Sequence, residues 1–91
     1  GKGTVIDQYV KARDRMSKPG SALAAVKNSI PELANASSKI VSKKDRKNIN
    51  VTEKDVGTLL AIENDDGSYT VNMVTIVDSE PILKPVFNTP D

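Results

Sequence analysis

The sequence predicts an α+β domain in which two or three N-terminal helices pack on a small antiparallel sheet of two or three strands formed by a C-terminal hairpin. Two observations carry this prediction. Apolar residues recur at helical spacing in the first half of the chain, and the second half changes to runs of β-forming residues around a turn. The 91 residues suit one domain, with a helical part over 4–42, a basic linker or loop over 43–55, a β part over 56–88 and a short disordered tail.

The first predicted helix covers residues 4–16. Its apolar positions recur at helical spacing and are Val5, Ile6, Tyr9, Val10, Ala12 and Met16. Asp7 and Lys11 form a favourable i,i+4 pair on the opposite face. We expect this helix to supply the central apolar stripe, so Val10→Asp should destabilise the fold severely by burying an unpaired carboxylate.

Two shorter helices are predicted to follow. Residues 18–20, Lys-Pro-Gly, end the first helix, and Ser21 is placed to cap a second one that runs to Ile30. The Ser29 to Glu32 spacing is typical of a capping box, so a third helix is expected from there to about Val41. Two short helices with a tight joint are typical of an αα-hairpin or a helix-turn-helix.

The C-terminal half is predicted to form strands. Residues 58–63 and 68–77 are rich in β-forming side chains and are separated by the turn tetrad 64–67, Asn-Asp-Asp-Gly. The second of these strands is apolar on both faces, which predicts that it is covered on both sides near its end. Residues 82–87 offer a final strand, and Pro85 favours an edge position for it.

The composition argues against an enzyme. With no His and no Cys, the chain lacks the usual general base, the thiolate nucleophile and the commonest zinc ligands. The segment around Asp65 and Asp66 fails as a calcium loop, because Ile62 and Met73 occupy the first and twelfth ligand positions. We therefore predict no catalytic residue, no metal and no cofactor.

The composition also bears on the compartment. No apolar run approaches the roughly 20 residues that span a bilayer, so membrane insertion is not expected. The chain is expected to be soluble. The lack of cysteine leaves the compartment open and slightly favours the cytoplasm.

The charge is split between the two halves of the chain. Residues 1–47 hold eleven Lys and Arg against four Asp and Glu, a balance of +7, and residues 48–91 hold two against eight, a balance of −6. Net charge of this kind governs association rather than fold. The preferred prediction is a non-enzymatic protein-binding or assembly module that uses its basic and acidic faces to bind another protein or a copy of itself. Mutual neutralisation of the two faces within one monomer is the simpler alternative.

A second functional prediction is a winged-helix DNA-binding protein. Three helices followed by a hairpin give the required order, and basic residues lie on and after the candidate recognition helix. The predicted contact residues for either a partner or nucleic acid are Lys39, Lys43, Lys44, Arg46 and Lys47. Glu32 at the start of that helix, and Asp65 and Asp66 at the wing tip, argue against DNA because phosphates repel them. Nucleic acid therefore ranks below protein as a partner.

Overall fold

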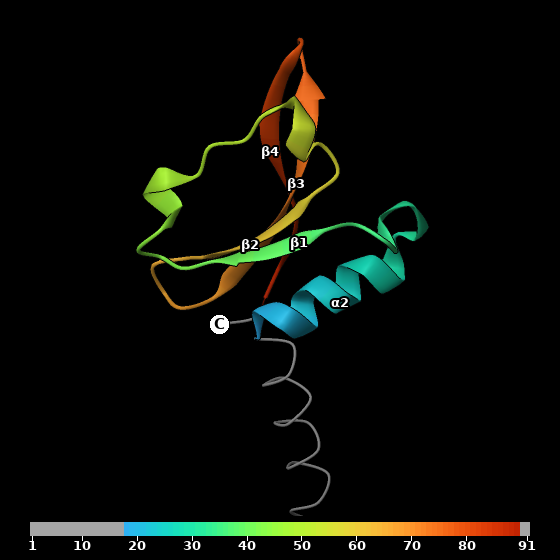
Figure 1. The fold of residues 1–91 in the computed structure, drawn as a ribbon. Helices are drawn as coiled ribbons and strands as arrows, with labels where there is room; N and C mark the ends of the chain where they lie inside the picture. Colours follow the sequence, from blue (N-terminus) through green and yellow to red (C-terminus); the bar gives the residue numbers. More distant parts are fainter. Residues whose placement is uncertain (1–17, 90–91) are drawn as a thin grey trace, which may run out of the picture.

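A single α-helix packs against a four-stranded mixed sheet in the part of the chain that the computed structural model describes, residues 18–89 (Figure 1). The helix is α2 (Pro19–Ser29), and the strands are β1 (Ser38–Val41), β2 (Leu59–Glu63), β3 (Tyr69–Val77) and β4 (Glu80–Asn88). The strand order is β1-β2-β3-β4, with β1 parallel to β2 and the other pairs antiparallel. The prediction of two or three N-terminal helices on a two- to three-stranded antiparallel sheet is wrong. The predicted helix over residues 4–16, with its Val10→Asp test, lies outside the described residues.

The second predicted helix is confirmed as α2, but its start differs from the prediction. Pro19 occupies the first turn, where the missing N–H costs nothing, and Lys18 is the N-cap without a side-chain hydrogen bond. Ser21 therefore lies inside the helix rather than capping it. The helix ends at Ser29, and the C-cap Ile30 has an extended backbone and an N–H that donates to the Val26 carbonyl (3.0 Å).

The third predicted helix is absent, and a strand takes its place. Pro31–Leu33 forms only the short 3-10 helix η1, and the expected Ser29 capping box does not form because Ile30 is the N-cap. The chain then becomes β1, which pairs in parallel with β2 in the register Ser38↔Leu59. Long-range pairing supplies the backbone partners that a helix would have supplied locally, and the β-branched pair Ile40 and Val41 suits it.

The predicted hairpin and edge strand are confirmed. Gly67 has a positive φ of 88°, and its N–H donates to the Asn64 carbonyl (3.0 Å), which closes the turn between β2 and β3. Strand β4 lies at the edge of the sheet, as Pro85 indicated. The pairing of β3 with β4 shifts register between Val71 and Asn72, which marks a bulge.

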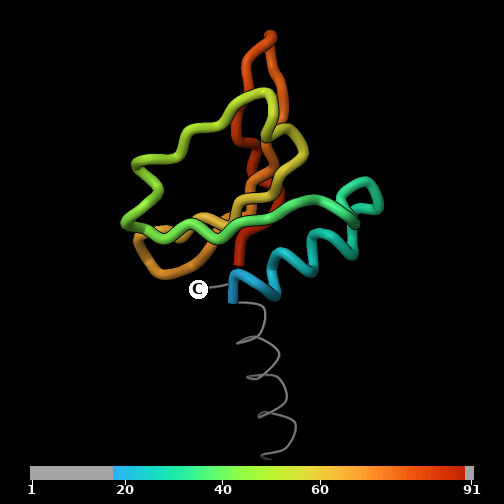
Figure 2. The backbone as a smooth tube through the Cα atoms, in the orientation of Figure 1, coloured from blue at the N-terminus to red at the C-terminus, as the bar shows by residue number. Residues whose placement is uncertain are grey.

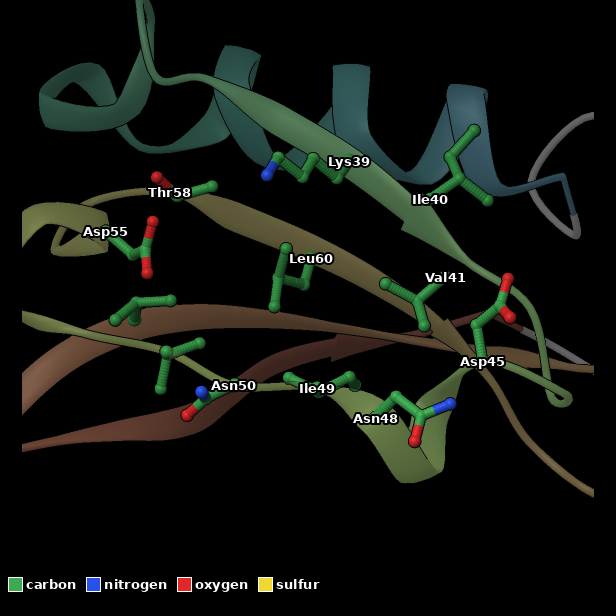
Figure 3. A pocket seen from close by; sticks show the side chains of 12 residues that line it. Lys39, Ile40, Val41, Asp45, Asn48, Ile49, Asn50, Asp55, Thr58 and Leu60 are labelled. Carbon is green, nitrogen blue, oxygen red and sulfur yellow. The ribbon is translucent and has the colours of Figure 1, made fainter.

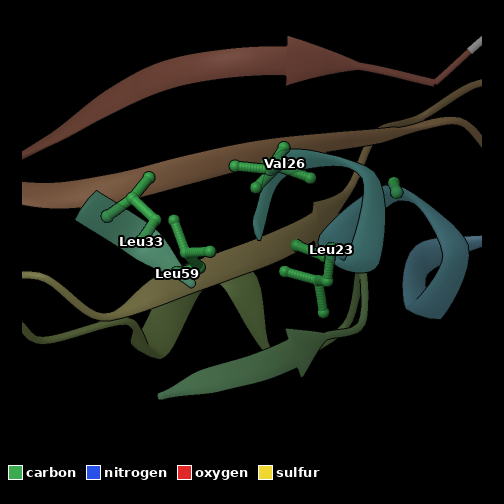
Figure 4. Close-up of a cluster of buried hydrophobic side chains, with 7 residues drawn as sticks. Leu23, Val26, Leu33 and Leu59 are labelled. Carbon is green, nitrogen blue, oxygen red and sulfur yellow. The ribbon is translucent and has the colours of Figure 1, made fainter. Parts of the chain in front are cut away.

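The main core lies between α2 and one face of the sheet (Figure 4). Its buried members are aliphatic and are Ala22, Leu23, Val26, Leu33, Leu59, Ala61 and Val71. On the opposite face Leu60 and Val74 are also buried. The expectation that β3 is covered on both sides near its end is wrong, because Ile76 and Val77 are 40% and 47% exposed.

Candidate interaction site

The five predicted contact residues lie on a strand and the turns after it, not on a helix. Lys39 belongs to β1, Lys43 and Lys44 lie in the turn that follows, and Arg46 and Lys47 lie in the short 3-10 helix η2 (Arg46–Asn48). The predicted recognition helix is therefore absent. The winged-helix arrangement loses the element that would enter a DNA groove.

Part of this basic stretch is neutralised by the β2–β3 hairpin. The Arg46 guanidinium forms an ion pair with Asp65 and donates to the backbone carbonyl of Glu63 (3.2 Å). The backbone N–H of Lys43 donates to Glu63 Oε1 (2.8 Å). Lys39, Lys43, Lys44 and Lys47 are exposed. Within the monomer the charge of Arg46 is therefore neutralised by Asp65, while the exposed lysines beside it form no ion pair with any other described residue.

At the acidic tip of the β2–β3 hairpin, the carboxylate of Asp66 is hydrogen-bonded within the turn. Asp66 Oδ1 accepts hydrogen bonds from the Ser68 hydroxyl (2.6 Å) and the Ser68 backbone N–H (2.9 Å). These bonds, the hydroxyl first, lower the pKa of the Asp66 carboxyl below its ordinary value of 3.8. Within residues 18–89 no group of three or more acidic side chains is arranged to hold a metal ion.

Residues 42–58, which we call the arch, form a wide loop between the end of β1 and the start of β2 (Figure 2). Its first turn is closed by the N–H groups of Asp45 and Arg46, which both donate to the Ser42 carbonyl at 3.0 Å. Its far end rejoins the sheet, since the Gly57 N–H donates to the Val74 carbonyl (2.9 Å) and the Val74 N–H donates to the Thr58 carbonyl (3.0 Å).

The middle of the arch carries a capping box around the 3-10 helix η3 (Glu53–Asp55). Asp55 Oδ2 accepts from the Thr52 N–H (2.8 Å), and Thr52 Oγ1 accepts from the Lys54 N–H (3.3 Å). The Thr-x-x-Asp spacing is a variant of the usual capping signature and was visible in the sequence. The arch is therefore an ordered loop rather than a plain linker.

A pocket of about 370 Å³ lies between the arch and the sheet, on the side away from α2 (Figure 3). Its sheet side is formed by the buried Leu60 and Val74, and its loop side by Ile49 and Val51. In Figure 3 Leu60 and Val41 point toward Ile49, while Ile40 points toward the helix side of the sheet. The rest of the lining consists of Ile40 and Val41 of β1 and of polar side chains, namely Lys39, Asp45, Asn48, Asn50, Asp55 and Thr58. The pocket thus has two apolar walls and a polar rim.

The second exposed feature is the end of the β3–β4 hairpin, residues 75–82, which we call the ribbon. Strand β2 pairs with β3 only as far as Met73, and the arch pairs only with Val74, so residues 75–77 pair with β4 alone. The ribbon protrudes from the sheet in Figures 1 and 2. Its turn residues Asp78 and Ser79 both have positive φ, 52° and 68°, as a type I′ turn requires.

The ribbon exposes aliphatic side chains on both of its faces. Ile76, Val77 and Ile82 are 40%, 47% and 38% exposed. Because side chains alternate along a strand, Val77 and Ile82 lie on the α2 side, while Ile76 lies on the arch side with its partner Pro81. Asp78 and Glu80 add two negative charges to the ribbon and no basic residue offsets them.

The sequence analysis missed both features. The apolar residues of the ribbon were visible on both faces of the predicted strand, but they were interpreted as buried. The pocket had no sequence signal, because its walls come from segments of the arch, β1, β2 and β3 that only the fold brings together.

The chain matches no family model, and neither a curated protein nor a solved structure is significantly similar to it. Within residues 18–89 the helices are too short or too polar to span a bilayer.

Proposed function

We propose that this domain is a non-enzymatic assembly module, which binds a copy of itself through the ribbon and uses its basic and acidic surfaces to orient the contact. The observation that carries the proposal is the exposure of Ile76, Val77 and Ile82 on a two-stranded ribbon. A bare two-stranded hairpin is at best marginally stable in water, so a partner that covers it would stabilise it. Clustered exposed apolar side chains beside charged ones are typical of protein-binding surfaces.

The charge distribution supports a copy of the chain as the partner. Residues 39–47 contain five basic side chains and one acidic one, whereas the ribbon contains two acidic side chains and no basic one. Arg46 is paired with Asp65, but Lys39, Lys43, Lys44 and Lys47 are exposed. Opposite charges at separate places on one molecule favour head-to-tail contact, and they act mainly on the rate and orientation of association.

Light scattering over a range of protein concentrations tests this proposal. We expect the average mass to rise above that of the monomer, and to rise less at about 1 M salt, where the Debye length falls to about 3 Å. A double variant, Ile76→Ser with Val77→Ser, should remain monomeric because it removes the apolar contact. Val56→Ser is the matched control, since Val56 is 46% exposed but lies outside both the ribbon and the pocket lining. A monomeric wild-type protein at every concentration and at both salt levels would contradict self-assembly.

A further inference from the structure

We infer that the ribbon of one copy docks into the pocket beneath the arch of a second copy. This inference rests on the proposed self-assembly and adds the receiving surface to it. Both surfaces belong to the described part of one chain, and they are different surfaces, one protruding and one hollow.

The shapes of the two surfaces are complementary. An element with apolar side chains on both faces buries them all only when it is inserted between two apolar walls, and docking on a flat surface would leave one face in water. Ile76 lies on one face of the ribbon, and Val77 and Ile82 lie on the other. The pocket offers two such walls, with Val41 and Leu60 on the sheet side and Ile49 and Val51 on the arch side. Its volume of about 370 Å³ gives room for aliphatic side chains from the ribbon end.

The charges at the two surfaces are also complementary. Lys39 lines the pocket, and the exposed lysines of the turn at the start of the arch follow it in the chain. Asp78 and Glu80 lie at and next to the ribbon turn, so insertion of the ribbon brings them toward these lysines. Asp45 and Asp55 also line the pocket and oppose this attraction. Both are hydrogen-bonded within the arch, Asp45 to the Ser42 hydroxyl (3.1 Å) and Asp55 to the Thr52 N–H (2.8 Å), and the basic side chains of residues 39–47 outnumber them.

Docking of this kind is heterologous. A dimer keeps a free pocket on one copy and a free ribbon on the other, so assembly continues into a chain or closes into a ring. A copy with a defective ribbon can still receive a ribbon, and a copy with a blocked pocket can still offer one. The two defects therefore complement each other when the two proteins are mixed.

Cysteine trapping tests the docking directly, because the chain contains no cysteine of its own. One protein carries Val77→Cys in the ribbon, and a second, with a tag that changes its size, carries Asn50→Cys in the pocket lining. Both positions are exposed, so neither change should disturb folding. We expect a disulfide between the two proteins under mild oxidation. The control pair replaces Asn50→Cys with Glu32→Cys, which is exposed in η1 on a different part of the chain and should cross-link at least tenfold less.

A complementation experiment accompanies the trapping. The ribbon variant, Ile76→Ser with Val77→Ser, is mixed with a pocket variant, Asn50→Trp, whose large side chain obstructs the pocket. Each variant alone should be monomeric, and the mixture should stop at a heterodimer in light scattering.

The outcomes separate the inference from the proposed function. Equal cross-linking at Asn50→Cys and Glu32→Cys, or unchanged assembly by Asn50→Trp while the ribbon variant is monomeric, would overturn docking in the pocket and leave assembly through the ribbon intact. A wild-type protein that stays monomeric would overturn both.

Discussion

Gly67 shows how one backbone position decides the geometry of the β2–β3 hairpin. Its φ of 88° lies in the region that side chains of L-residues disfavour. A Cβ built at this position has no neighbouring atom within 4 Å, so the cost of a side chain there is conformational and not steric. Gly20, in the first turn of α2, also has open space around it but has no positive φ.

These two glycines form a matched pair for mutation. We expect Gly67→Ala to lower the free energy of unfolding by about 1–2 kcal/mol, because alanine resists a left-handed conformation. Gly20→Ala should raise it by about 0.4–1 kcal/mol, because alanine reduces the entropy of the unfolded chain. Urea denaturation of both variants measures the sign of each change in the free energy of unfolding. Shifts of the same sign would show that the turn does not require a positive φ.

At the scale of elements, α2 covers one face of the sheet and so completes the main core. It buries Ala22, Leu23 and Val26 against the sheet, where Leu59 of β2 and Val71 of β3 are fully buried. The remaining residues of the helix are half-buried or exposed. The fold of this small domain therefore depends on a few aliphatic contacts rather than on a large core.

Truncating one of these contacts should destabilise the domain strongly. Leu23 is 6% exposed, so we expect Leu23→Ala to cost about 2–5 kcal/mol through lost burial and the cavity left behind. Asn28→Ala, at an exposed position of the same helix, should change stability by less than about 0.5 kcal/mol. Chemical denaturation measures both. Similar costs for the two variants would mean that α2 does not pack on the sheet as described.

At the scale of the whole molecule, the charge split of the sequence is only partly balanced within the fold. The hairpin turn brings Asp65 to Arg46 and Glu63 to the Lys43 backbone. The exposed lysines of residues 39–47 and the acidic ribbon remain separate surfaces. A basic surface of this kind also attracts phosphates, so its response to DNA separates the two functional predictions.

We expect at most weak, non-specific binding to duplex DNA at physiological salt. The recognition helix is absent, Arg46 is paired with Asp65, and acidic residues lie beside the basic turn. Any binding that occurs should fall with salt with a log-log slope of about −0.9 per phosphate neutralised. Reversal of Lys43, Lys44 and Lys47 to Glu should flatten that slope by about three units if each lysine contacts one phosphate. A mobility-shift assay that shows a sub-micromolar, sequence-selective complex would favour nucleic-acid binding over assembly.

The candidate site was predicted only in part. The exposed lysines of residues 39–47 could be identified from composition, because charged side chains remain in water in almost any fold. The partner of Arg46 could not, since Asp65 lies nineteen positions further along the chain. The exposure of Ile76, Val77 and Ile82 could not be predicted either, because hydrophobic side chains are expected to be buried. They are exposed because β2 pairs with β3 only as far as Met73.

The sequence by itself determined the elements whose hydrogen bonds are local. The body of α2 and the β2–β3 hairpin with its Gly67 turn were predicted correctly, because their backbone partners are close in sequence, at most as far apart as Leu59 and Met73. The spacing of their apolar side chains also follows the period of a helix or of a strand. Pro85 likewise placed β4 at an edge, because proline cannot donate to a neighbouring strand.

Only the tertiary structure decided the secondary structure of residues 34–41. Their apolar spacing is compatible with a helix, but the parallel partner of Ser38 is Leu59, which follows only after the whole arch. A strand of four residues, Ser38–Val41, is too short to show a period of two, and its stabilisation comes from distant backbone groups that no local pattern reports. The arch, the pocket beneath it and the protruding ribbon all depend on that one parallel pairing and on where β2 begins, at Leu59 opposite Met73. They were therefore decided by contacts between segments far apart in the chain.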